Sequence, residues 1–139
     1  MAVILAENEV SIESVHALFV KAFLRAEIDS DGDIHVTEGL EFPIWLSIDE
    51  EQRLIRLFTF VSWDVDAYPL VTEDSVNHLN ATIILPAFYV RKGESGKLYA
   101  HYFMSYSDGI IDSHIINLAR RFSGASIFGV RQILEVQLH

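Results

Sequence analysis

The chain has 139 residues, with 20 Asp and Glu against 10 Lys and Arg, so its formal net charge is −10 at pH 7. Hydrophobic residues make up 50% of it and cysteine is absent, which excludes disulfide frameworks, thiolate zinc sites and a cysteine nucleophile. The composition is too apolar for a disordered chain, and the negative charge argues against nucleic-acid binding because phosphate contacts require a basic surface. We expect a single domain over residues 1–139.

The acidic residues are concentrated in the first half of the chain. Residues 1–75 contain 16 acidic and 4 basic residues, whereas residues 76–139 contain 4 acidic and 6 basic ones. This asymmetry indicates either a solvated, solubilising surface or an acidic surface for a basic partner. The N-terminus lacks the pattern of a signal peptide, and no apolar run approaches the ~18 residues needed to span a membrane. We therefore expect a cytoplasmic protein that does not associate with membranes.

The first half predicts one helix followed by three strands. Apolar residues recur at helical spacing from Ile12 to Ala26, and Ser11 is placed to cap the start of that helix. Acidic residues around Gly32 are typical of a turn, and the polar segment before Arg53 is typical of a hairpin loop. The expected elements are a helix over about 11–27, a turn over 29–33, strands over 34–36, 42–48 and 53–63, and a hairpin loop over 49–52.

The second half predicts a short helix, a hairpin and a long helix. Thr72 suits the N-cap of the short helix, with Val71 and Val76 placed as a hydrophobic staple. Gly124 and Gly129 lie within the long apolar periodicity of the last helix, where we expect them to mark a bend. The expected elements are a helix over about 72–80, strands over 82–90 and 97–106 joined by a turn over 92–96, and a final helix after residue 109. The fold class is therefore α+β, in the order α-β-β-β-α-β-β-α, with helices covering an antiparallel sheet of about five strands.

This order and several short motifs resemble the YbjN family of bacterial proteins, within the type III secretion chaperone-like fold. The resemblance extends from about residue 10 to residue 134. It is carried by Asp31-Gly32-Asp33-Ile34, by Val76-Asn77-His78-Leu79-Asn80, by the strand from Tyr99 to Tyr106, and by Gly109-Ile110-Ile111. The resemblance implies a regulatory protein with that fold. Secretion chaperones are likewise small, acidic, cytosolic and usually dimeric, and they bind an extended segment of a client protein.

Motifs that would indicate an enzyme or a cofactor are incomplete. Asp29, Asp31 and Asp33 suggest a calcium loop, but Ile34 stands where such a loop requires Gly and Leu40 where it requires Glu. Asp31, Asp33 and His35 have the spacing to share a strand face and hold a metal, although a solvated turn is the favoured interpretation. The segment 93–97 resembles the end of a phosphate-binding loop without its remaining residues. No G-x-S-x-G motif is present, and we expect no catalytic residue, no metal and no cofactor.

The more informative feature is that three predicted strands are apolar on both faces. Side chains alternate between the faces of a strand, so the set with Leu46, Leu57 and Ala100 faces one way while a second, aromatic set faces the other. The candidate partner-binding surface is this second set: Trp45, Phe58, Phe60, Tyr99 and Phe103. Either the chain's own middle helix or terminal segment covers these residues, or they form an intermolecular surface.

The sequence therefore favours a non-enzymatic protein-binding module, chaperone-like or regulatory, that acts as a homodimer. A client, a regulatory partner or a toxin is the expected binding partner, and nucleic acid is not. An immunity protein that neutralises a toxin through its acidic surface is the first alternative, because charge complementarity accelerates association with a basic cleft. A small enzyme with a dispersed active site is the second.

Overall fold

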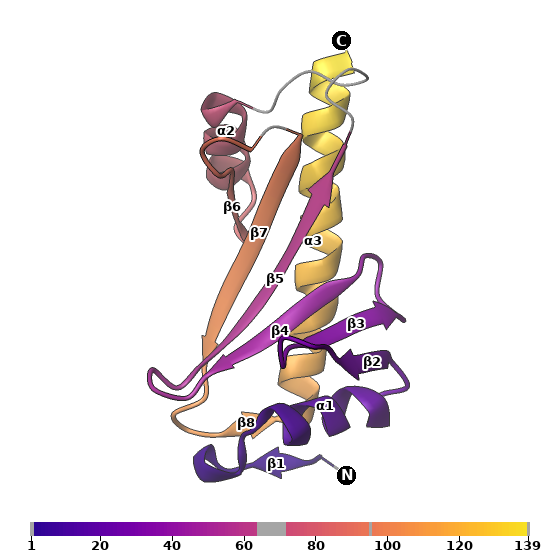
Figure 1. The fold of residues 1–139 in the computed structure, drawn as a ribbon, viewed down its shortest axis with the longest axis vertical. Helices are drawn as coiled ribbons and strands as arrows, with labels where there is room; N and C mark the ends of the chain where they lie inside the picture. Colours follow the sequence, from indigo (N-terminus) through magenta and orange to yellow (C-terminus); the bar gives the residue numbers. More distant parts are fainter. Residues whose placement is uncertain (1, 64–71, 95, 139) are drawn as a thin grey trace.

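The computed structural model describes residues 2–63, 72–94 and 96–138, and the side chains among them up to residue 133 (Figure 1). Within these residues the largest element is an antiparallel sheet with the strand order β2-β3-β4-β5-β7-β6. Strands β5 and β7 are the longest and pair along their whole length, from Leu54 opposite Ser105 to Ser62 opposite Lys97. The strands are β2 (Arg25–Ile28), β3 (Ile34–Glu38), β4 (Ile44–Asp49), β5 (Leu54–Ser62), β6 (Ala87–Tyr89) and β7 (Lys97–Ser105).

Three α-helices accompany the sheet: α1 (Ile12–Lys21), α2 (Glu73–Thr82) and α3 (Asp112–Leu138). The side chain of Ser11 accepts a hydrogen bond from Ser14 N at the start of α1, and Thr72 accepts one from Ser75 N at the start of α2. Both residues therefore satisfy a helix N–H that would otherwise lack a partner. The expected caps are confirmed.

The N-terminal segment forms a small second sheet, which the sequence did not predict. Strand β1 (Ile4–Leu5) pairs with β8 (Ile110–Ile111), and the 3-10 helix η1 (Glu7–Glu9) follows β1. Gly109 stands at the entry to β8 with φ of +86°, and a Cβ there would lie 2.5 Å from the carbonyl oxygen of Leu5. Only glycine therefore allows both the backbone conformation and this close approach.

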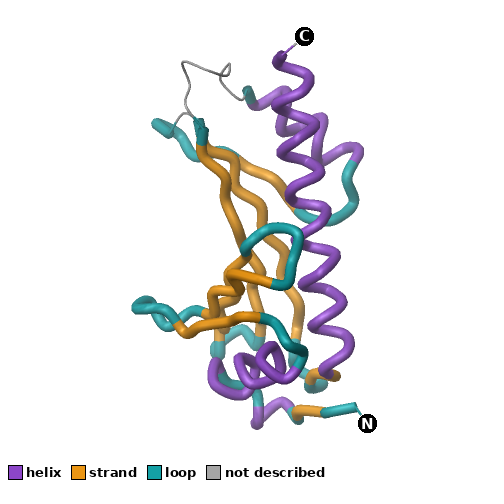
Figure 2. The backbone as a smooth tube through the Cα atoms, turned by 90° about the vertical axis from the view of Figure 1, so that its right-hand side faces the viewer, coloured by secondary structure: helices purple, strands orange, loops and turns teal. Residues whose placement is uncertain are grey.

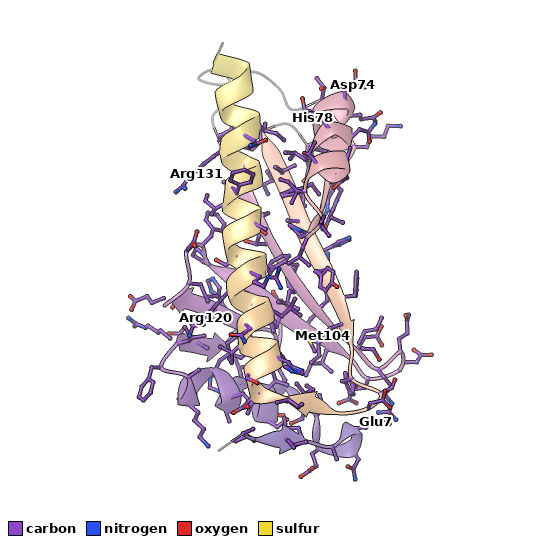
Figure 3. All side chains as sticks on the ribbon, turned by 180° about the vertical axis from the view of Figure 1, so that it is seen from behind. Glu7, Asp74, His78, Met104, Arg120 and Arg131 are labelled. Atoms are coloured by element: carbon purple, nitrogen blue, oxygen red, sulfur yellow. The ribbon has the colours of Figure 1, made fainter. Side chains whose placement is uncertain are left out.

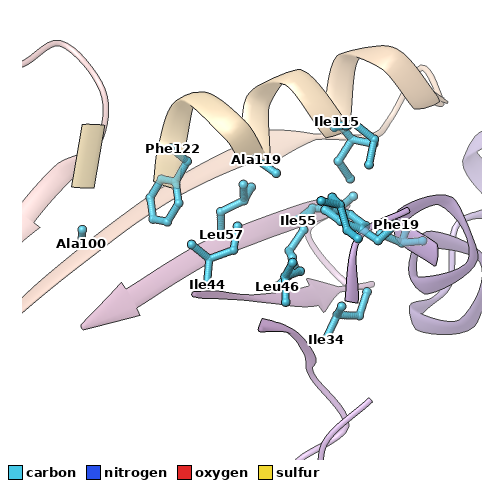
Figure 4. Packing of buried hydrophobic residues seen from close by; sticks show 14 of the residues in the cluster. Phe19, Ile34, Ile44, Leu46, Ile55, Leu57, Ala100, Ile115, Ala119 and Phe122 are labelled. Atoms are coloured by element: carbon cyan, nitrogen blue, oxygen red, sulfur yellow. The ribbon is translucent and has the colours of Figure 1, made fainter. Parts of the chain in front are cut away.

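The helices lie on one side of the main sheet, and the core fills the space between them. Figure 2 shows α3 running along one face of the strands, and Figure 4 shows Ile115, Ala119 and Phe122 of α3 above the residues of β4 and β5. All three of these α3 residues are fully buried. Ser123, also buried, binds the backbone N–H and carbonyl of Phe42 at 2.7 Å each and so ties α3 to the segment before β4. Aromatic residues on the other face of the sheet are covered by none of the described helices.

The expectation of a helix over 11–27 is wrong in its second half. Helix α1 ends at Lys21, and residues 25–28 form the edge strand β2. Leu24 N donates to Phe19 O and Phe23 N donates to Val20 O, which is the hydrogen-bond pattern of a Schellman motif. A helix end of this kind is recognised in a sequence by a glycine in the left-handed position. Here that position holds Phe23, with φ of +65°, so the apolar periodicity predicts a helix that is too long.

The remaining secondary-structure predictions are partly confirmed and partly corrected. The fold class, the hairpins and the approximate element order are confirmed, but the main sheet gains β2 and so has six strands among the described residues. The strand expected over 82–90 is reduced to β6 after the Leu85–Pro86 bond, which is cis. Neither Gly124 nor Gly129 interrupts the last helix, because α3 is continuous through both. The proposed staple residue Val71 lies outside the described residues.

Candidate functional site

The five predicted partner-binding residues lie on the face of the sheet opposite α3, which we call the open face. It is turned toward the viewer in Figure 1. Trp45 of β4 stands opposite Phe58 of β5, and Phe60 of β5 stands opposite Tyr99 of β7. Phe103 lies on the same face of β7, opposite Arg56. The alternation in the sequence thus brings all five residues to one face.

Four of these side chains, those of Trp45, Phe58, Phe60 and Tyr99, form a continuous stack across the strands. The ring centroids of Trp45 lie 6.1 Å from Phe58 and 5.4 Å from Phe60, with nearly parallel planes. Phe60 in turn lies 6.0 Å from Tyr99. Such offset stacks are favourable beyond the area they bury. The open face is therefore organised by contacts among its own side chains.

The five residues differ in exposure, which the alternation alone could not predict. Phe60 and Phe103 keep 38% and 46% of their surface accessible, Trp45 and Phe58 are half-buried, and Tyr99 is only 7% exposed. Tyr99 is buried by neighbours on its own face, since Tyr89 stacks on it at 5.1 Å and Arg91 lies over its ring. Of the five predicted residues, Phe60 and Phe103 are therefore the most available to a partner.

Four further residues belong to the open face and were missed by the sequence reasoning. His35 stacks on Trp45 at 4.2 Å with planes only 4° apart. His101 lies between Tyr89 and Phe103, at 4.8 Å and 5.2 Å. The same period-two alternation places His35, Arg56 and His101 here, but at the level of sequence His35 is considered only as a metal ligand, and the open face is predicted from aromatic residues alone. Tyr89 lies outside the three strands that are predicted to be apolar on both faces.

Arg56 occupies the middle of the open face and forms no ion pair with any acid in the described part of the chain. Its guanidinium carbon lies 4.7 Å above the ring of Phe58 and 5.9 Å from that of Phe103. Its Nη2 donates to the hydroxyl of Tyr89 at 3.0 Å and lies 3.4 Å from Nδ1 of His101. Burial and, to a smaller degree, the positive charge of Arg56 lower the pKa of His101 below its ordinary value. The imidazole is thereby held in its neutral form over a wider pH range.

Two more cations lie at the end of β7 nearest β6. The guanidinium carbon of Arg91 is 4.2 Å from the ring centroid of Tyr99, and Nζ of Lys97 is 5.1 Å from that of Phe60. The hydroxyl of Tyr99 donates a hydrogen bond to the carboxylate of Glu94, which raises the pKa of Tyr99. Among the described residues, three cations and one acid therefore surround this part of the open face, although the whole chain is strongly negative.

The acidic residues considered for a metal site form a turn instead. Oδ1 of Asp29 accepts hydrogen bonds from the backbone N–H groups of Asp31 and Asp33, each at 3.0 Å. Burial, followed by repulsion from Asp29 and Asp31, raises the pKa of Asp33. Among the residues that the structure describes, no group of three or more histidine or acidic side chains is placed to hold a metal ion. The expected solvated turn is therefore an internally hydrogen-bonded one.

Comparisons with known proteins place this fold. No curated protein matches the chain. The structure is similar to the crystal structure of YbjN from E. coli, described as "a putative transcription regulator", with a TM-score of 0.67 and 10% sequence identity over 97% of this chain and 96% of that one. At that identity the likeness shows the fold. No helix among the described residues is long and apolar enough to cross a membrane.

The amino-acid sequence itself also matches a known family. Residues 11–126 match the model of the YbjN family, whose description is "Putative bacterial sensory transduction regulator". The matched range begins at the N-cap of α1 and ends within α3, so it includes every strand of the main sheet. The resemblance noted from short motifs is thus confirmed, and the chain belongs to the YbjN family.

Proposed function

We propose that this protein is a non-enzymatic, cytoplasmic protein-binding module, chaperone-like or regulatory in role, that acts as a homodimer and as one domain over residues 1–139. The observation that carries the proposal is the open face: an aromatic stack spanning β4, β5 and β7 that none of the described helices covers. Aromatic side chains dominate the energetics of protein interfaces, and exposed apolar patches on such domains mark interaction surfaces.

The arrangement suits an extended protein segment as the occupant. Phe60 of β5 faces Tyr99, and Phe103 of β7 faces Arg56, so the two exposed rings lie on neighbouring strands with three residues between them along the β5–β7 pair. Arg56 stands between them and offers donors to a polar group of the partner. Because the stack is held by its own contacts, a partner would order few side chains on binding, which lowers the entropic cost of association.

The test replaces the two most exposed rings together, as Phe60→Glu with Phe103→Glu. Since both side chains are already well exposed, we expect the double variant to remain folded. A charge at these positions would oppose burial against a partner. The matched control is Phe128→Glu, because Phe128 is 53% exposed but lies on α3, away from the open face.

Two measurements on these proteins decide the proposal. Sedimentation equilibrium gives the oligomeric state, and capture from the native host followed by mass spectrometry gives the bound proteins. The proposal predicts that the double variant loses the dimer, or loses proteins that both the wild type and Phe128→Glu retain. If the wild type is monomeric and all three proteins capture the same set, the open face is not a protein-binding surface and the proposal fails.

The half-buried rings provide a harder test of the same surface. We expect Trp45→Glu and Phe58→Glu, made separately, to stay folded but with altered oligomeric state or partner binding. Each variant also loses stacking within the sheet, so its unfolding midpoint in urea should fall relative to the wild type. If both simply unfold, these two rings serve the stability of the sheet rather than a partner.

An immunity protein that neutralises a toxin remains the alternative. It is favoured by two acidic turns at the ends of strands, Asp29–Asp33 and Asp49–Glu51, whose side chains are mostly exposed. An acidic surface accelerates association with a basic cleft, and salt screens that attraction. This function predicts an association rate with the partner that falls steeply between 50 mM and 500 mM salt, whereas docking on the aromatic stack predicts a weak dependence.

A further inference from the structure

The open face contains a pocket that neither the family nor the proposed function assigns. It has a volume of about 270 Å³ and lies over β5, β6 and β7. Its aromatic wall includes Phe60, Tyr89 and Tyr99, with Tyr89 and Tyr99 stacked at 5.1 Å and 13°. Pockets for small ligands begin at roughly 300 Å³ and combine apolar walls with a few polar groups. The pocket is slightly below that range, so its size and aromatic lining suit only a small, flat molecule.

The polar groups of the pocket are predominantly cationic. Arg56, Arg91 and Lys97 all line it, and each lies over an aromatic ring at 4.2 to 5.1 Å. Cation–π contact fixes the position of such side chains. Among the described residues the ion pairs are Arg25 with Glu38 and Arg53 with Glu7, so none of the three pocket cations forms an ion pair with a described acid.

Arg56 already uses one hydrogen bond on a neutral oxygen of the pocket. Its Nη2 donates to the hydroxyl of Tyr89 at 3.0 Å. An anionic oxygen is a stronger acceptor than a phenol by about a factor of two. Glu94, the acid of the pocket, already accepts from Tyr99. Arg56 is thus positioned for a negative group that none of its described hydrogen-bond partners supplies.

The charge of the whole chain limits the size of the anion. Because its net charge is −10, the protein repels a long polyanion. The many phosphates of such a molecule would extend beyond the pocket toward acidic surface. A molecule with one ring system and one or two negative charges would instead meet the charged residues that line the pocket, namely Arg56, Arg91, Lys97 and Glu94. The contrast favours a small ligand over a nucleic-acid strand.

We infer that this pocket binds a small aromatic anion, with its ring against Tyr89, Tyr99 and Phe60 and its carboxylate, sulfonate or phosphate group held by Arg56, Arg91 and Lys97. This inference is independent of the proposed function, because the ligand would bind the purified protein with no partner present. Phe60 and Tyr99 belong both to the pocket and to the open-face stack, so an occupied pocket would cover part of the surface proposed for a protein partner.

The test uses the dye 8-anilinonaphthalene-1-sulfonate and its neutral analogue N-phenyl-1-naphthylamine, which carries the same rings without the sulfonate. Fluorescence titration of the wild type should show saturable binding of the dye at one site, at least 10-fold tighter than that of the neutral analogue. Arg91→Gln combined with Lys97→Gln should weaken the dye by about 10-fold and the neutral analogue by less than 2-fold.

The matched control changes the net charge equally at other positions. It combines Lys92→Gln, next to Arg91 in the chain, with Arg131→Gln, on α3 (Figure 3). These substitutions should leave dye binding within 2-fold of the wild type. The inference is overturned if the two double variants lose dye affinity equally, if the neutral analogue binds as tightly as the dye, or if no saturable binding occurs. It is also overturned, in favour of a nucleic-acid strand, if a twelve-residue oligothymidylate displaces the dye far better per nucleotide than thymidine monophosphate does.

Discussion

The ring of Phe88 packs directly against the backbone of Gly129. Phe88 belongs to the short edge strand β6 and is only 3% exposed, while Gly129 lies in the second half of α3. A Cβ built on Gly129 would stand 2.3 Å from Cζ of Phe88 and 2.8 Å from its Cε1. The absence of a side chain at residue 129 is therefore what allows α3 to approach the end of the main sheet that bears β6.

We expect Gly129→Ala to destabilise the protein, although alanine is the better helix former. Overpacking a buried contact costs about 1 to 3 kcal/mol, which exceeds the roughly 0.5 to 1 kcal/mol that replacing a helical glycine contributes. The control is Gly124→Ala in the same helix, where a Cβ would lie 3.4 Å from the exposed carboxylate of Glu41 and should stabilise. Urea unfolding measures both variants, and equal stabilisation of the two would contradict the packing at Phe88.

Asn80 holds the same strand to α2. Its Nδ2 donates to Phe88 O at 2.9 Å, and its Oδ1 accepts from Phe88 N at 2.8 Å. We expect Asn80→Ala to reduce the free energy of unfolding by about 1 to 3 kcal/mol, because two backbone groups lose their partner. Asn77→Ala, at an exposed position on the same helix, should change it by less than about 0.5 kcal/mol. Faster hydrogen exchange at Phe88 N–H in the Asn80 variant alone would identify the cause.

The pKa of His101 should respond to Arg56. Burial is the larger cause of its lowered pKa and the Arg56 charge the smaller one, so Arg56→Gln should raise the pKa partway toward 6.5. NMR titration of the imidazole measures this, and Arg53→Gln, at an exposed arginine nearby in the chain, should leave the value unchanged. Because the unfolded chain binds the proton more readily, stability due to His101 falls as pH drops below 6.5 toward the folded pKa. A pKa that does not move in Arg56→Gln would show that burial alone sets it.

Asp33 should make the opposite contribution to the pH dependence. Its pKa is raised by burial and by repulsion from Asp29 and Asp31, so its charged form is disfavoured in the folded state. Its unfavourable contribution is present at neutral pH and disappears as pH falls through the folded pKa to 3.8. We therefore expect Asp33→Asn to stabilise the protein at pH 7 by about 0.5 kcal/mol or less, since the site is partly solvated, and to have no such effect at pH 3. A lower urea midpoint for the variant at pH 7 would mean that attraction to Arg56 outweighs the repulsion.

Phe23 gives a test of the end of α1. It has φ of +65° and is 96% exposed, so its side chain contributes little packing while its Cβ stands in a left-handed conformation. Phe23→Gly should stabilise the protein by about 1 kcal/mol, because glycine adopts this conformation without the steric penalty. Phe23→Ala retains the Cβ and should show no gain. If the glycine variant is less stable than the alanine variant, the Schellman motif does not limit the stability of this helix end.

The sequence alone determined the fold class, the capped starts of α1 and α2, and which side chains share each face of β4, β5 and β7. These properties follow from local rules: a cap satisfies a neighbouring N–H group, and side chains alternate along a strand. The family was also recognisable from the order of the elements together with short motifs near Asp31, Val76 and Gly109.

The tertiary structure decided what the alternation left open. It showed that the helices pack on one face, that Phe60 and Phe103 stay exposed while Tyr99 is buried by Tyr89 and Arg91, and that Arg56 lies among aromatic rings. Each of these depends on contacts between strands that are distant in the sequence or on the covering of a face, and periodicity carries no information about either. The net charge of −10 likewise did not indicate a cationic pocket. Net charge is a sum over the whole sequence, whereas a binding site depends on which charged residues the strands bring together.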